Sequence, residues 1–155
     1  PARVDKLIVV DIAPVQYPPH HTDVFAGIAA IDLQSIKSRS EADQQLSQQV
    51  ESPGVRAFLL KNLYREEGSF RWRANFTALE RQYPHVAAAP ARGAFSRPTL
   101  FVKGAKSNYL LNEYQQAVTE RFSNVQLKII NDAGHWPHAE KPETFLRLVT
   151  RFLES

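Results

Sequence analysis

Two polar residues in this sequence have the types and the surroundings that proton transfer requires. His135 follows Gly134 in a turn-rich segment that comes directly after the expected strand 125–130, and Asp11 follows the apolar run 7–10. An imidazole can remove a proton from a hydroxyl group and return it to a leaving group. A carboxylate that bonds to the second ring nitrogen orients the imidazole and stabilises its charged form. We therefore interpret His135 as a candidate general base and Asp11 as its carboxylate partner.

Each of these residues also has a purely structural explanation. His135 could only pack beside Trp136, and Asp11 could only end a strand by bonding to backbone amides before Pro14. We favour the chemical role for both residues. Asp132 lies three residues before His135 and is better explained as a turn residue, whereas His138 fits a supporting role.

The first half of the sequence predicts one strand followed by short helical pieces. Residues 7–10 are apolar and β-branched, which is typical of a strand buried on both faces of a parallel sheet. From 22 to 83 the apolar spacing is helical. Three helix faces are indicated: Val24, Ile28 and Ile31; Val55, Leu59 and Leu63; Phe76, Leu79 and Tyr83. Ser40 with Asp43 resembles a capping box, Pro53-Gly54 separates two helices, and residues 69–73 favour a short exposed strand.

The second half predicts alternating strands and helices. Residues 99–102 and 125–130 are expected to be strands, and 142–153 a terminal helix with Pro142 in its first turn. Between the strands, one helix face is indicated by Leu111, Tyr114, Val118 and Phe122. This order predicts parallel strands joined by right-handed crossovers. We expect an α/β fold with a core of residues 1–14 and 97–155 and a helical insertion of residues 15–96.

The layout and three motifs resemble the C-terminal half of an α/β-hydrolase, in particular the YbfF-type bacterial esterases. The motifs are residues 11–14 (DIAP), 70–73 (FRWR) and 134–142 (GHWPHAEKP). The resemblance runs over nearly the whole chain and implies a partial α/β-hydrolase fold in which residues 15–96 form a lid. It also implies a Ser-His-Asp mechanism that hydrolyses small acyl esters or thioesters through an acyl-enzyme.

Within this resemblance the chain supplies the histidine and the acid but not the nucleophile. Many α/β-hydrolases carry the acid in the loop that here spans 103–109, and this loop has no carboxylate, so Asp11 is the expected acid. A nucleophile elbow requires Gly-x-Ser-x-Gly, and none of the six glycines stands in that pattern. The residues 1–155 alone are therefore expected to be inactive, and their beginning is expected to lie inside a longer chain.

Two non-catalytic alternatives remain open. The chain could be a folded fragment that binds or self-associates through the exposed edge of strand 7–10, because an unpaired strand invites pairing with another chain. Alternatively, the lid helices could be a protein-interaction module in which the catalytic residues are vestigial. The expected macromolecular partner is thus either the missing N-terminal half or a second copy.

Composition excludes several other classes of protein. The net charge is +3 with scattered basic residues, so we expect no nucleic-acid partner. No apolar run approaches the roughly 20 residues of a membrane-spanning helix. There is no cysteine, and the adjacent His20 and His21 have no carboxylate cluster beside them, so we expect no metal and no cofactor. A cytoplasmic location is the default expectation.

Four aromatic residues could line an acyl pocket or could simply be packed as lid core: Phe70, Trp72, Phe76 and Trp136.

Overall fold

The computed structural model describes residues 2–155, which form two compact units. The sheet unit holds the residues up to Gln16 together with Ala89–Ser155, and the insertion unit is Tyr17–Ala88. Residues 89–96 therefore belong to the sheet unit. Arg121 contacts this segment, because its Nη1 donates hydrogen bonds to the carbonyls of Pro90 and Ala91.

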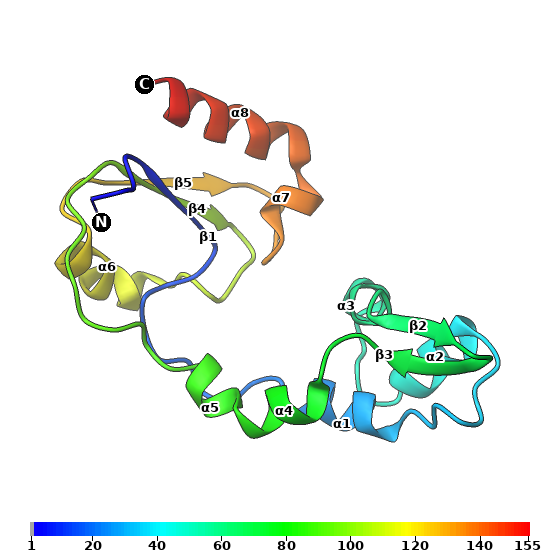
Figure 1. Ribbon diagram of the computed structural model, residues 1–155. Helices are drawn as coiled ribbons and strands as arrows, with labels where there is room; N and C mark the ends of the chain where they lie inside the picture. The colour runs from blue at the N-terminus through cyan, green and yellow to red at the C-terminus, as the bar shows by residue number, and fades with distance from the viewer. Residues whose placement is uncertain (1) are drawn as a thin grey trace. The chain divides into compact units, whose positions relative to one another are not determined.

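The sheet unit contains three parallel strands in the order β1-β4-β5 (Figure 1). These strands are β1 (Leu7–Val10), β4 (Thr99–Gly104) and β5 (Val125–Ile130). The central strand β4 is almost completely buried, as its apolar sequence predicts. The predicted parallel α/β arrangement is therefore confirmed.

Strand β1 differs in one respect from the prediction. All four of its side chains are half-buried, whereas the sequence suggested burial on both faces. The reason is its position, because β1 lies at one end of the sheet and pairs only with β4. Its backbone therefore has one open edge among the described residues.

Helices cover the two faces of this sheet (Figure 1). Helix α8 (Pro142–Glu154), with Pro142 in its first turn as predicted, packs Phe152 against Leu100 and Val102 of β4. On the opposite face lie a short 3₁₀ turn, η1 (Asn112–Tyr114), and helix α6 (Gln115–Arg121). The predicted single helix face over 111–122 is wrong, because the 3₁₀ turn changes the helical period before α6 begins and leaves only Val118 of that face buried.

The insertion unit is mainly helical and has its own apolar core. Its helices are α1 (Thr22–Ala30), α2 (Arg39–Leu46), α3 (Pro53–Leu60), α4 (Phe76–Arg81) and α5 (Tyr83–Val86). A hairpin of β2 (Leu63–Glu66) and β3 (Ser69–Trp72) completes it. The two ends of the unit meet, since the Tyr17 amide donates a 3.0 Å hydrogen bond to the Ala87 carbonyl.

Three local predictions for the insertion unit are wrong. Phe76, Leu79 and Tyr83 do not share one helix face, because α4 ends at Arg81, Tyr83 begins α5, and Leu79 is 42% exposed. Leu63 belongs to β2 and not to a helix face, because the turn at Glu67 and Gly68, both with positive φ, closes a hairpin that pairs Leu63 with Trp72. The cap of α2 is Ser38 and not Ser40, since the Ser38 hydroxyl accepts from the Glu41 amide at 3.1 Å. The predicted strand 69–73 is confirmed as β3.

Candidate active site

Asp11 is placed by the left-handed turn that ends β1. Its φ is 50°, a conformation that aspartate tolerates better than most residues. The side chain is fully buried (0% exposed), and both of its oxygens are bonded. Oδ1 accepts the Gly104 amide at 2.9 Å, and Oδ2 lies 2.8 Å from His135 Nδ1. These contacts offset the cost of burying a carboxylate.

His135 lies in the loop after β5, at the same carboxyl-terminal edge of the sheet as Asp11. The structure therefore brings together the two predicted site residues, which are 124 positions apart in the chain. A carboxylate can only accept a hydrogen bond, so the contact assigns the ring proton to Nδ1. Nε2 is then left as a base, and the side chain is 39% exposed, which permits access to a reacting group.

Tyr109 forms one wall beside the imidazole and was missed by the sequence analysis. Its ring stacks on that of His135 with centroids 3.7 Å apart and planes 17° apart. The Ser107 hydroxyl accepts the Tyr109 amide at 3.2 Å, and the Ser107 amide donates to the Gly104 carbonyl. Ser107 thus shapes the loop after β4. The topology could have indicated Tyr109, because the loops that follow neighbouring parallel strands lie side by side.

Gly104 allows β4 to approach the histidine loop closely. A Cβ at this position would lie 1.9 Å from the Gly134 carbonyl oxygen and 2.8 Å from that of Ala133. The Lys106 amide donates to the same Ala133 carbonyl at 2.9 Å. Any side chain at 104 would therefore push the histidine loop away from the sheet. The sequence analysis did not identify this role.

Glu140 is a second residue that the sequence analysis missed. It ends the single-turn helix α7 (Pro137–Glu140), and its carboxylate turns back to the histidine loop. Oε2 accepts the Gly134 amide at 2.8 Å and Oε1 accepts the Trp136 amide at 3.1 Å. The sequence could have indicated this role, because a glutamate shortly after the start of a helix resembles the spacing of a capping box.

Asp132 has the turn geometry that the sequence predicts. It adopts a φ of 58°, and its exposed carboxylate pairs with Lys106 at 3.2 Å. The sharp turn before His135 is therefore made at Asp132, whereas Gly134 has no positive φ. His138 is exposed, and its ring packs edge-on against Phe145 at 6.0 Å.

The aromatic residues considered for an acyl pocket have different environments. Phe70 is buried in the core of the insertion unit. Trp72 and Phe76 contact each other edge-to-face at 5.1 Å and line a cavity of about 300 Å³ within that unit. Trp136 lies in the sheet unit, at the start of α7.

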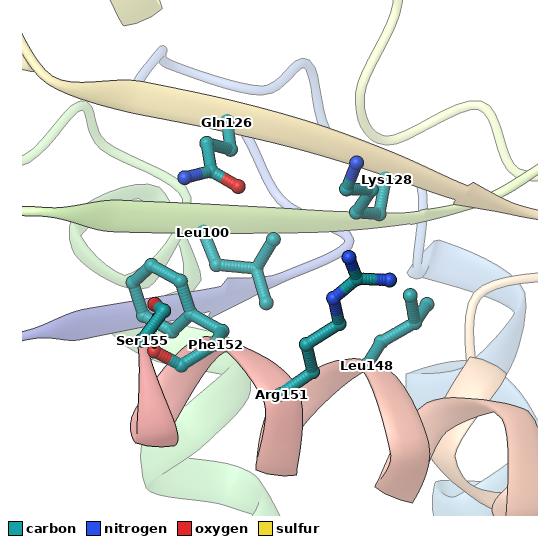
Figure 2. A pocket seen from close by; sticks show the side chains of 7 residues that line it. All are labelled: Leu100, Gln126, Lys128, Leu148, Arg151, Phe152 and Ser155. Carbon is teal, nitrogen blue, oxygen red and sulfur yellow. Dashed lines mark hydrogen bonds between the residues drawn. The ribbon is translucent and has the colours of Figure 1, made fainter.

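Another cavity, of about 270 Å³, lies between α8 and the sheet (Figure 2). Leu100, Leu148 and Phe152 line its apolar part, and the side chains of Lys128 and Arg151 project toward the same opening. Neither Asp11 nor His135 lines this cavity. It is therefore separate from the candidate site.

The adjacent histidines have partners other than a metal. His21 Nδ1 lies 2.6 Å from the Tyr83 hydroxyl, and His20 Nδ1 lies 2.7 Å from the Pro18 carbonyl. Within residues 2–155 no group of three or more His, Cys, Asp or Glu side chains is arranged to hold a metal ion. Over the same residues, no helix has both the length and the apolar character needed to cross a membrane.

Comparison with known proteins identifies the family. The family model described as alpha/beta hydrolase fold matches residues 55–142. Esterase YbfF of Escherichia coli strain K12 is 37% identical over 152 residues, which cover 97% of this chain and 58% of that protein. The mouse sn-1-specific diacylglycerol lipase ABHD11 is 36% identical, with 99% of this chain and 52% of that protein covered.

A solved structure, a marine microorganism esterase, superposes with a TM-score of 0.90 at 33% identity and covers 96% of this chain and 60% of its own. An esterase of Mycobacterium tuberculosis, Rv0045c, has a TM-score of 0.62 at 18% identity, a likeness in fold alone. The chain spans somewhat more than half the length of the curated relatives it matches. It belongs to the α/β-hydrolase fold family, and the relatives it resembles are named as esterases and lipases.

Proposed function

We propose that this chain carries the histidine and acid of a carboxylic-ester or thioester hydrolase. The observation that supports this most is the 2.8 Å contact between Asp11 Oδ2 and His135 Nδ1. It leaves Nε2 of a half-exposed imidazole free to act as a base beside the carboxyl ends of parallel strands, where such folds react. The esterase and lipase names of the relatives support an ester as substrate.

In the proposed mechanism a serine outside these 155 residues supplies the nucleophile. Nε2 of His135 takes the serine proton as the oxygen attacks the acyl carbon, and the resulting imidazolium returns that proton to the leaving alcohol or thiol. Water then attacks the acyl-enzyme. Nε2 of His135 takes a proton from this water, and the imidazolium gives it to the serine oxygen as the carboxylic acid is released. Asp11 keeps the Nδ1 proton in place and stabilises the imidazolium. The oxyanion donors would also come from the additional sequence.

We also propose that the insertion unit is the lid of this hydrolase. The support is its place in the chain, because the unit starts six residues after Asp11 and returns before β4. Segments inserted after the carboxyl end of a parallel strand start at the edge where α/β folds bind ligands.

Complementation tests the proposed hydrolase. This chain is co-expressed with a complementary segment from a relative, containing the preceding strands and a Gly-x-Ser-x-Gly elbow, and hydrolysis of short p-nitrophenyl esters is measured. We expect turnover only when both parts are present, because the serine requires the His135 base. Equal turnover by the complementary segment alone would contradict the assigned role of His135.

The open edge of β1 favours self-association as a second candidate function. The amides of Leu7 and Asp11 donate to the carbonyls of Pro98 and Val102 beside β4. Because successive backbone groups of a strand alternate in direction, the amides of Ile8 and Val10 point to the open edge. Such an edge is a template for pairing with a second copy.

We therefore expect residues 1–155 to form dimers whose proportion rises with concentration in sedimentation measurements. The amides of Ile8 and Val10 should exchange slowly with solvent in the dimer and faster on dilution, while the Leu7 amide, bonded within the unit, serves as the control. A monomer at all concentrations, or a dimer with freely exchanging Ile8 and Val10 amides, would rule out pairing through this edge.

A further inference from the structure

We propose that Glu140 is a positioning residue, which fixes the backbone on both sides of His135 so that the imidazole meets Asp11. The catalytic meaning of this inference rests on the proposed function of His135 as a general base. The positioning itself is a property of the 155-residue chain and can be measured without turnover.

The carboxylate of Glu140 holds two peptide groups that flank a single residue. Oε2 accepts the Gly134 amide at 2.8 Å, and Oε1 accepts the Trp136 amide at 3.1 Å. His135 is the residue between them. One contact would allow the loop to pivot, whereas two contacts from one rigid carboxylate fix its direction. Hydrogen bonds to a charged acceptor are also roughly twice as strong as neutral ones.

Helix capping explains only one of these two contacts. Trp136 is the N-cap of α7, so its bond to Glu140 resembles the return bond of a capping box. Gly134 lies outside the helix, on the far side of His135, and its bond adds nothing to α7. The second contact therefore indicates a role in holding the histidine loop.

Gly134 is the residue type that admits the carboxylate at this short range. A Cβ on Gly134 would lie 3.2 Å from Oε1 and 3.4 Å from Oε2, closer than most side-chain contacts. The carbonyl oxygen of the same residue lies where a side chain on Gly104 would be. The Gly134 residue is thus held between the Glu140 carboxylate and the end of β4, directly before the imidazole.

This arrangement matters because His135 is not buried. Its side chain is 39% exposed and contacts the Asp11 carboxylate and the Tyr109 ring. The ring meets these two partners only when the backbone of the loop presents it to them. In enzymes a displacement of about 1 Å caused by a distant substitution can lower the rate about a hundredfold.

The test on the chain itself uses proton NMR of the His135 ring. The Nδ1 proton in the bond to Asp11 should give a strongly deshielded resonance that exchanges slowly with water. We expect Glu140→Ala to broaden or abolish this resonance while the circular-dichroism spectrum stays that of a folded protein. Glu140→Gln should recover part of the signal, because its amide oxygen can accept from one of the two backbone amides.

Glu143→Ala is the matched control, since Glu143 is an exposed glutamate in the first turn of α8. It should leave the ring resonance unchanged. An unchanged resonance in Glu140→Ala would overturn the proposal. If Glu140→Ala does not fold, Glu140→Gln decides the question: a resonance identical to that of the original chain would equally overturn it, and an attenuated one would support it.

The complemented hydrolase separates this inference from the proposed function. There, Glu140→Ala should lower kcat about tenfold to a hundredfold with KM unchanged. Full kcat in that variant would overturn the positioning role even though the hydrolase is real. The opposite result is also informative. If the His135 resonance depends on Glu140 but the complemented protein hydrolyses no ester, the positioning role is supported and the proposed function is rejected.

Discussion

Asp11→Asn is expected to lower the turnover number of the complemented hydrolase by up to about four orders of magnitude while the fold is retained. That is the scale seen when the triad aspartate of a serine protease becomes asparagine. The structure gives a specific reason. The Gly104 amide donates to Oδ1, so an asparagine keeps that bond only by directing its own NH₂ group at His135 Nδ1. Nδ1 must then accept, the proton moves to Nε2, and the base is lost.

Asp132→Asn is the control for this experiment. Asparagine tolerates the left-handed conformation of residue 132, and the exposed ion pair with Lys106 contributes little. Its turnover number should therefore stay within a few-fold of the original. Steady-state kinetics and thermal unfolding of both variants make the comparison. A large loss of turnover in Asp132→Asn, together with normal turnover in Asp11→Asn, would show that Asp132 and not Asp11 is the acid.

The second large effect is the inactivity expected of residues 1–155 alone. They should neither hydrolyse short p-nitrophenyl esters nor be labelled by a fluorophosphonate, because both reactions need an activated serine beside His135. The sequence contains no Gly-x-Ser-x-Gly motif. Intact-mass measurement after incubation with the fluorophosphonate provides the test, with the complemented hydrolase as the positive control.

Ser107 is the first serine to check for a fluorophosphonate adduct. It lies in the loop after β4, yet it is only 6% exposed, and its hydroxyl accepts the Tyr109 amide. We therefore expect no adduct on it. A stoichiometric adduct on Ser107 would show that this chain has a nucleophile of its own and would reject the proposed division of the catalytic residues.

The central elements of the sheet unit were predictable from sequence. The run 99–102 is continuously apolar except for Thr99, and this pattern predicts the buried parallel strand β4. The run 125–130 is predicted correctly as a strand, although β5 is mostly exposed. Asp11 and His135 could be paired because each follows such a strand, and parallel strands end at one edge. The choice of Asp11 also used the absence of a carboxylate in residues 103–109 and the resemblance to the esterases, and it required no knowledge of side-chain packing.

Other features depend on contacts that the linear pattern does not encode. Leu63 has helical spacing from Leu59, but cross-strand packing against Trp72 decides its structure. The need for glycine at 104 arises from a carbonyl thirty positions later in the sequence. Glu140 and Tyr109 gain their roles only once their loops are folded against His135. Tertiary context of this kind overrides local propensity.

The meeting of Tyr17 and Ala87 bears on how the insertion unit could change during evolution. Because its two ends are joined by a backbone hydrogen bond, the segment between them adds about seventy residues without separating β1 from β4 in the sheet. Closing a longer or shorter loop between fixed ends costs little additional entropy, about 0.6 kcal/mol per doubling of length. Insertions, deletions or exchange of this segment can therefore change the insertion unit itself without disturbing the strand register of β1 and β4, which holds Asp11 near His135.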